Sequence, residues 1–175
     1  MFRRRRYYGG IRRSKKRYSN ETTSIAISQN VLNSTFPIFD GNLGYTLVPN
    51  VTTQGTRKVK NMTISLSAVG CTEPLLCAIV YCPGGLRPST LTPGDTTTGS
   101  GSVLYEPNQN IIMQFVLNPS KNDTFVNTNV QTFRTRLARN LDSNDYIALI
   151  CRPAIGLSAQ TTVKVCGTFN YSIAY

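Results

Sequence analysis

The strongest constraint on the fold is a two-residue alternation of apolar and polar side chains that recurs along the chain. It is clearest over Thr161–Tyr175, because successive side chains of an extended strand point to opposite faces. One face of this segment carries Val163, Val165, Phe169, Tyr171, Ile173 and Tyr175, and the other carries Lys164, Thr168, Asn170 and Ser172. Such a segment is predicted to be a strand whose apolar face covers a core.

The same alternation predicts five more strands, at Thr22–Gln29, Val59–Val69, Ser102–Tyr105, Ile111–Leu117 and Val130–Ala138. The side chains expected to face the core are Ile25, Ile27, Met62, Ile64, Leu66, Ala68, Ile111, Met113, Phe115, Leu117, Phe133, Thr135 and Leu137. Two further strands, Leu75–Cys82 and Asp145–Arg152, are apolar on both faces. That pattern is typical of a central strand or of one covered by another subunit.

The segments between these strands are rich in Gly, Pro, Asn and Thr, which favour turns and loops. They are Pro37–Gly55, Pro83–Gly101, Asn118–Asn129 and Pro153–Gln160. Eight short strands with long polar loops and no helical stripe predict an all-β fold, an eight-stranded antiparallel jelly-roll sandwich. An immunoglobulin-like sandwich is the competing architecture, but it typically uses about 100 residues and shorter loops.

Charge divides the chain into two unequal parts. Residues 1–18 contain nine Lys and Arg and no acidic residue, whereas the remaining residues contain ten basic and eight acidic ones. The first part therefore carries +9 of the net charge of +11. We interpret residues 1–20 as a basic arm and residues 21–175 as the folded β domain.

The chemistry of the arm suits the binding of nucleic-acid phosphates. Guanidinium groups stay charged and form paired hydrogen bonds to phosphate, and tyrosine rings stack on unpaired bases at about 1–3 kcal/mol per stack. Gly9 and Gly10 interrupt any helix, so the arm is expected to be disordered until it meets its partner. The predicted nucleic-acid-binding residues are Arg3, Arg4, Arg5, Arg6, Tyr7, Tyr8, Arg12, Arg13, Lys15, Lys16, Arg17 and Tyr18.

Other roles for the arm are weaker or compatible with this one. The runs RRRR and KKR also suit a nuclear localisation signal, a role that does not compete with nucleic-acid binding. A membrane-binding helix would need a Leu/Phe face that the arm lacks. The extension of a ribosomal protein is usually joined to a basic body, whereas this body carries only +2.

Two smaller basic clusters lie in the body, and each has two interpretations. Arg57, Lys58 and Lys60 precede the second long strand, and Arg134, Arg136 and Arg139 lie in and after a later one. Either cluster continues the track of the arm, or its members are ordinary charges that guard strands against aggregation. We include Arg57, Lys58 and Lys60 as secondary candidates for nucleic-acid binding.

No catalytic constellation is evident. The chain has no histidine, and its eight carboxylates are scattered apart from Asp142 and Asp145 in the turn DSND, which we interpret as turn capping. No G-x-S-x-G, P-loop or G-x-G-x-x-G motif occurs. We therefore expect a protein that is not an enzyme and uses no cofactor.

The five cysteines favour buried free thiols over a metal site or a disulfide framework. Cys71, Cys77, Cys82, Cys151 and Cys166 are odd in number and contain no C-x-x-C pair. The sequence also has no run of eighteen apolar residues and no apolar segment after its basic stretch. We expect neither a helical membrane span nor a secretory signal.

The arm MFRRRRYYGGIRRSKKRY, followed by a Thr/Asn-rich body of about 155 residues with eight expected strands, resembles the capsid proteins of small circular single-stranded-DNA viruses, of circovirus type. The resemblance implies a jelly-roll protomer, sixty copies of which close a T=1 icosahedral shell with the arms inside on the genome. It also implies that host nuclear import factors bind the arm, that the protein occurs in the virion and in the host nucleus, and that a host cell-surface receptor meets the outer loops.

Three alternatives remain beside this resemblance. The coat proteins of satellite single-stranded-RNA viruses share the same plan, so DNA is preferred over RNA on the resemblance alone. A cellular, non-enzymatic nucleic-acid-binding β protein would also carry such an arm. A secreted trimeric jelly-roll ligand is disfavoured because no signal sequence is recognisable.

Overall fold

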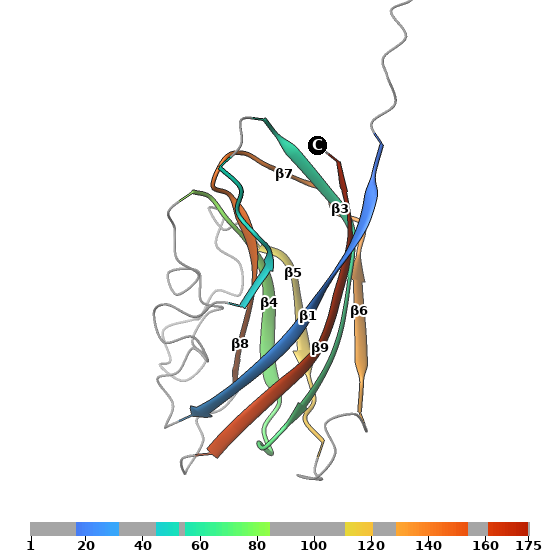
Figure 1. Ribbon diagram of the computed structural model, residues 1–175. Coiled ribbons are helices and arrows are strands. Elements are labelled where there is room, and N and C mark those ends of the chain that lie inside the picture. The colour runs from blue at the N-terminus through green and yellow to red at the C-terminus, as the bar shows by residue number, and fades with distance from the viewer. Residues whose placement is uncertain are drawn as a thin grey trace, which may run out of the picture.

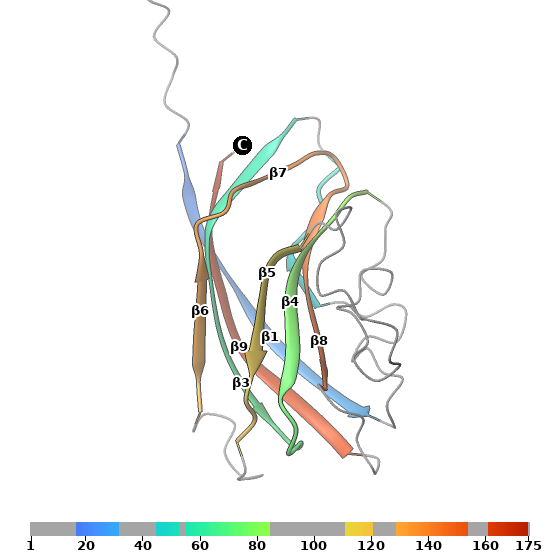
Figure 2. The same cartoon turned by 180° about the vertical axis from the view of Figure 1, so that it is seen from behind.

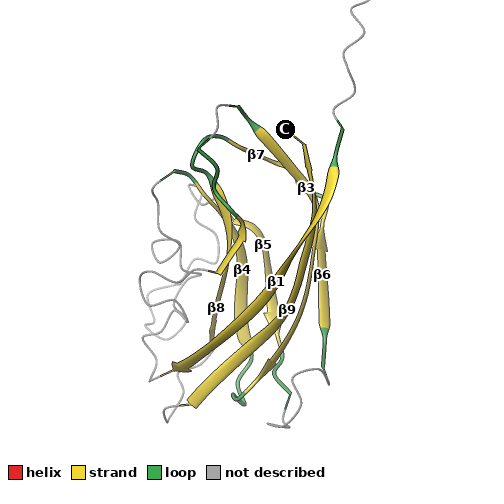
Figure 3. Ribbon diagram, in the orientation of Figure 1, coloured by secondary structure: helices red, strands yellow, loops and turns green. Residues whose placement is uncertain are grey.

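The computed structural model describes residues 17–31, 45–52, 55–84, 111–120, 129–153 and 161–174 (Figure 1). Every regular element in these ranges is a strand, and no helix occurs among them (Figure 3). The strands are β1 (Ser19–Val31), β2 (Tyr45–Val48), β3 (Arg57–Val69), β4 (Leu75–Cys82), β5 (Ile111–Leu117), β6 (Gln131–Thr135), β7 (Arg139–Leu141), β8 (Tyr146–Pro153) and β9 (Thr161–Ala174).

The strands form two antiparallel sheets packed face to face, which Figures 1 and 2 show from opposite sides. The first sheet has the order β1-β9-β3-β6, with β7 also paired to β3, and the second has the order β2-β8-β4-β5. Because β6 and β7 pair with successive parts of β3, they fill one strand position between them. The result is eight positions in two sheets between which the chain crosses repeatedly. The predicted jelly-roll sandwich is confirmed.

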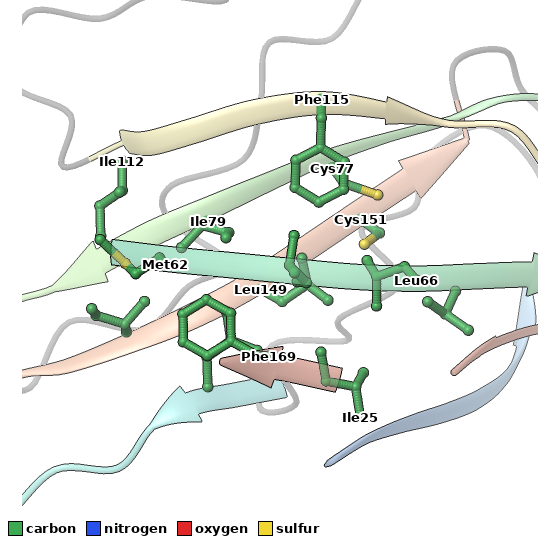
Figure 4. Packing of buried hydrophobic residues seen from close by; sticks show 14 of the residues in the cluster. Ile25, Met62, Leu66, Cys77, Ile79, Ile112, Phe115, Leu149, Cys151 and Phe169 are labelled. Atoms are coloured by element: carbon green, nitrogen blue, oxygen red, sulfur yellow. The ribbon is translucent and has the colours of Figure 1, made fainter. Parts of the chain in front are cut away.

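The core lies between the two sheets and is apolar throughout. Phe169, Met62 and Leu66 of the first sheet and Ile79 of the second are completely buried, and Figure 4 shows them converging from both layers. Each such side chain contributes about 1.5–3 kcal/mol when it leaves water. The rings of Phe115 and Phe133, with centroids 4.2 Å apart, stack between β5 and β6.

The outer faces of the two sheets differ in character. On the second sheet, Ala78, Val80 and Cys82 of β4 join Ala148 and Ile150 of β8 in a further cluster of buried apolar residues. This confirms that both strands are apolar on their two faces, as their sequences predict. The outer face of the first sheet is lined instead by Ser, Thr, Asn and basic residues. The large apolar side chains of this sheet point mainly to its inner face, although Val69 and Ala174 are buried on the outer one.

A β-bulge at Asn61 determines which side chains of β3 point into the core and which point outward. Asn61 has a φ of 53°, and the pairing of β3 with β9 shifts between Lys60 and Thr63. The extra residue allows both Val59 and Met62, three positions apart, to point into the core, where each is completely buried. Lys58 and Lys60 are thereby turned to the outer face. Without the bulge, simple alternation would place both lysines on the core side with Met62.

The same bulge corrects the prediction of a single strand over Val130–Ala138. β6 pairs with Met62–Leu66 and β7 with Arg57–Val59, so that the break at residues 136–138 faces the bulge. Leu137, which alternation assigned to the core, is 55% exposed. Its backbone N–H instead donates to the hydroxyl of Thr135, 3.2 Å away.

Two more expectations need correction, and two lie outside the described residues. The segment Pro37–Gly55, which its composition predicts to be a loop, contains β2, whose four residues are too few for an alternation to be recognised. In β5 a register shift buries Ile112 in the core where Ile111 was expected. The expected strand Ser102–Tyr105 and the side chain of Tyr175 are not among the described residues.

The bulge requires a residue at position 61 that tolerates a positive φ, and this requirement can be tested. Replacing Asn61 by Val puts a β-branched residue in the left-handed region and should destabilise the fold by about 1–2 kcal/mol. Asn61→Gly, the matched control, tolerates this φ and should stay within about 0.5 kcal/mol of the wild type. Urea unfolding measures both. Equal stabilities for the two variants would contradict the assigned role of the bulge.

Candidate nucleic-acid interface

Most of the predicted arm site lies outside the described residues, which begin at Arg17. The predicted contacts from Arg3 to Lys16 therefore stay predictions. Arg17 is exposed and Tyr18 is half-buried immediately before β1, whose pairing with β9 begins at Ser19 opposite Ile173. β1 begins at Ser19, one residue before the expected end of the arm at residue 20 and three before the expected strand at Thr22. The arm thus joins the body at an edge strand of the first sheet.

A cation–π contact fixes this junction. The Nζ of Lys60 lies 3.6 Å from the centroid of the Tyr18 ring. Lys60 opposes Ser172 of β9, and Ser172 in turn opposes Asn20 of β1 and donates a hydrogen bond to its side chain. The contact is worth about 0.5–1 kcal/mol at an exposed site. It places the last aromatic residue of the arm beside a body lysine on the outer face of the first sheet.

The basic residues of the body are not gathered into one cluster. Lys58 is half-buried on the same face as Lys60, and Arg134 is exposed on that face in β6. Arg139 opposes Val59, whose side chain points into the core, so Arg139 belongs to the other side of the sheet. Arg136 lies in the break between β6 and β7 and is exposed.

The structure corrects the inclusion of Arg57 among the nucleic-acid-binding candidates. Arg57 is only 5% exposed. Its Nη1 donates to the carbonyl of Pro49 at 2.8 Å, and its Nη2 donates to the carbonyl of Asp145 at 2.9 Å. A guanidinium committed to two backbone carbonyls inside the fold does not reach phosphate, so we leave Arg57 out of the interface.

Asp145 caps the turn between β7 and β8, as the sequence predicts. Its carboxylate accepts hydrogen bonds from the backbone N–H groups of Asp142, at 2.8 Å, and Gly84, at 2.9 Å, and from the hydroxyl of Tyr81. Asn144, with a φ of 66°, completes the turn. The turn, the end of β4 and the start of β3 are thus tied together at one end of the roll.

Burial keeps several groups protonated. It raises the pKa of Cys71 and of Cys82 to about 11 and that of Cys77 well above its ordinary value. Burial, with the hydrogen bond to Asp145, raises the pKa of Tyr81 to about 12. All five thiols are free, and Cys77 faces Cys151 across β4 and β8 (Figure 4). With their raised pKa values, Cys71, Cys77 and Cys82 are poor nucleophiles and poor metal ligands.

Two further features are absent from the described ranges. Within them no group of three or more His, Cys, Asp and Glu side chains is arranged to hold a metal ion. The described part of the chain also contains no helix long and apolar enough to cross a membrane.

Comparison with known proteins finds distant structural likenesses only. No protein-family model and no curated protein sequence matches this chain. The chain resembles a structure of infectious bursal disease virus, Gt strain, with a TM-score of 0.39 and 10% identity over 89% of this chain and 32% of that one. A mutant VP2 protein of the same virus, in derived T=1 particles, gives a TM-score of 0.38, 10% identity, and coverage of 90% and 32%.

A third likeness is to Eiger TNF from S. frugiperda, with a TM-score of 0.36 and 8% identity over 87% of this chain and 92% of that one. The present chain thus spans about a third of the length of the viral chains. At these TM-scores and identities, the likenesses do not bear on function.

The role assigned to Arg57 is testable by stability. Arg57→Met leaves the carbonyls of Pro49 and Asp145 without their donors and should destabilise the fold by about 3 kcal/mol. Lys58→Met, at the adjacent outward position, should change stability by no more than about 0.5 kcal/mol. Thermal or urea unfolding of both variants checks this. A small effect at Arg57 would mean that its guanidinium is dispensable to the fold.

Because the pKa of Tyr81 is raised, the free energy of unfolding should decrease at high pH. Between pH 10 and pH 12 the unfolded chain loses the phenolic proton while the folded chain retains it. The contribution of this group is therefore complete below pH 10 and declines as the pH rises to 12. The stability difference between wild type and Tyr81→Phe should narrow over that range. A constant difference in urea unfolding would contradict the assignment.

Proposed function

We propose that this protein is a viral coat protein that assembles into a closed shell and packages single-stranded nucleic acid through its basic arm. The observation that carries the proposal is the division of charge. Nine cations without one acidic residue precede a jelly-roll body that carries +2. Jelly rolls are a common architecture of viral capsid domains.

The separation of charge from the folded body suits assembly driven by nucleic acid. Nine like charges on each copy repel one another and oppose close association of the arms. A polyanion removes this repulsion and releases its own counterions. The body, close to neutral, is then free to make contacts between copies. Binding through the arm is strong, dependent on salt and largely independent of sequence.

The finer identity follows the resemblance of the arm and body to circovirus-type capsid proteins. On that basis we propose sixty copies in a T=1 shell, a single-stranded circular DNA genome, and entry into the host nucleus through import factors that bind the arm. A satellite virus with an RNA genome remains the nearest alternative. Extraction of the packaged nucleic acid, followed by digestion with DNase or RNase, distinguishes the two.

We further propose that the protein has no enzymatic activity. Asp142 and Asp145, the one close pair of carboxylates in the sequence, are engaged in the turn between β7 and β8. The hydroxyl of Tyr81 is held on Asp145. These groups are used to build one end of the roll.

Deleting residues 2–17 tests the role of the arm. The deletion spares Tyr18 and the nine strands of the described residues, so the body should fold with its thermal midpoint nearly unchanged. Packaging should be abolished, because nine phosphate-binding charges are lost. The measurement is nuclease-resistant nucleic acid that copurifies with the protein. Packaging at the wild-type level would refute the proposal.

Assembly itself needs a separate measurement. Negative-stain electron microscopy of the purified full-length protein should show uniform closed shells. A protein that stays monomeric with and without single-stranded nucleic acid would instead favour a cellular nucleic-acid-binding β protein.

A further inference from the structure

Polar side chains predominate on the outer face of the first sheet, and the exceptions among its described positions are Ala26, Val69, Cys166 and Ala174. Ser67, Val69, Ser172 and Ala174 on this face are buried. Its outward positions, taken from the register of the four strands, are Asn20, Thr22, Ser24, Ala26 and Ser28 in β1; Thr162, Lys164, Cys166, Thr168, Asn170, Ser172 and Ala174 in β9; Lys58, Lys60, Thr63, Ser65, Ser67 and Val69 in β3; and Thr132 and Arg134 in β6. We call these positions the outer polar face.

The outer polar face carries four cations and, among its described positions, no carboxylate. Lys58 and Lys60 are half-buried at the end where the arm joins, while Arg134 and Lys164 are exposed farther along the sheet. The acidic residues described elsewhere in the body, including Asp142 and Asp145, lie off this face. The face is therefore positive although the body as a whole carries only +2.

Protection of a sheet edge against aggregation does not explain most of these cations. Charged side chains that prevent edge-to-edge aggregation belong on edge strands. Lys58 and Lys60 lie in β3 and Lys164 lies in β9, and both strands are paired on their two sides. Only Arg134, in β6, occupies an edge. Three of the four charges thus stand on interior strands, and of these only Lys60 faces a gap in the pairing, at the break between β6 and β7.

The polar side chains between the cations are suited to a sugar–phosphate backbone. Much of protein–DNA hydrogen bonding is made by Lys, Arg, Ser, Thr and Asn to phosphate and sugar oxygens. The carboxamide oxygens of Asn20 and Asn170 accept hydrogen bonds from the hydroxyls of Ser172, at 2.9 Å, and Thr22, at 2.6 Å. Both Asn side chains are exposed, and their N–H₂ groups are then the donors they offer to solvent.

The size of the face allows an extended strand to lie along it. Lys60 opposes Ser172, and Lys164 lies eight residues before Ser172 along β9. At about 3.3 Å per residue, this places the two lysines roughly 26 Å apart. The four strands are together about 14 Å wide at their usual spacing. Tyr18, which contacts Lys60, connects the arm to one end of the outer polar face.

From this charge, position and continuity we infer that the outer polar face is a second binding surface, separate from the arm, for the phosphate backbone of single-stranded nucleic acid. The inference rests on the proposed function, because the arm delivers the strand that the face then holds. Lys58, Lys60, Arg134 and Lys164 bind phosphate, and binding does not depend on base sequence.

Two matched variants of the full-length chain separate the face from the arm. The face variant carries Lys58→Gln, Lys60→Gln, Arg134→Gln and Lys164→Gln, and the arm variant carries Arg3→Gln, Arg4→Gln, Arg5→Gln and Arg6→Gln. Each loses four charges. The association constant K for an oligothymidylate decreases as salt increases. In each variant the plot of log K against log salt should be less steep than in the wild type by about 3, at about 0.7 per lost phosphate contact. Thermal unfolding verifies that both variants fold.

The outcomes distinguish the two proposals. A wild-type slope in the face variant with a reduced slope in the arm variant would overturn the inference and leave the proposed function intact. A wild-type slope in the arm variant would count against the arm as the packaging site. Reduced slopes in both variants support both proposals.

Lysine footprinting of the wild-type chain provides a test that needs no variant. Oligothymidylate should reduce acetylation of Lys58, Lys60 and Lys164 by at least about fivefold. Lys164 is the decisive residue, because it lies roughly 26 Å from the junction with the arm. Unchanged acetylation of Lys164 at saturating oligothymidylate would overturn the inference even if the face variant failed to fold.

Discussion

The pairing of β9 with β1 on one side and β3 on the other is the interaction on which the rest of the structure depends. Thirteen residue pairs join the first and the last described strands, from Ser19 opposite Ile173 to Val31 opposite Thr161. The jelly roll therefore closes only when the last strand enters between two strands that precede it by about 100 residues or more. Such non-local pairing makes folding slow, because loop closure costs entropy before the contacts form.

The sheet that contains this pairing differs chemically from the other sheet. The inner face of β9 carries Val163, Val165 and Phe169 into the core, and its outer face meets polar positions of β1 and β3. In the second sheet the central strands β4 and β8 are apolar on both faces. Any contact of the body with a polyanion is therefore best served by the first sheet, which the arm also joins.

Two properties were readable from the sequence for different reasons. The arm is recognisable because an excess of like charge is a matter of composition and needs no fold to be seen. The sandwich is recognisable because alternation marks strands and their core faces. Two predictions, however, depended on register. The sequence pattern groups Arg57 with two neighbouring lysines and assigns Leu137 to the core, yet Arg57 is buried and Leu137 is exposed.

The sequence by itself determined the all-β class, most of the strands and the basic arm, because side-chain polarity and charge are local properties. The tertiary structure alone decided which side of the sheet Lys58 and Lys60 occupy. One extra residue in the left-handed conformation at Asn61 reverses the alternation before it. The alternation of apolar and polar residues in the sequence does not reveal such an insertion. The change in register exists only relative to the partner strand β9.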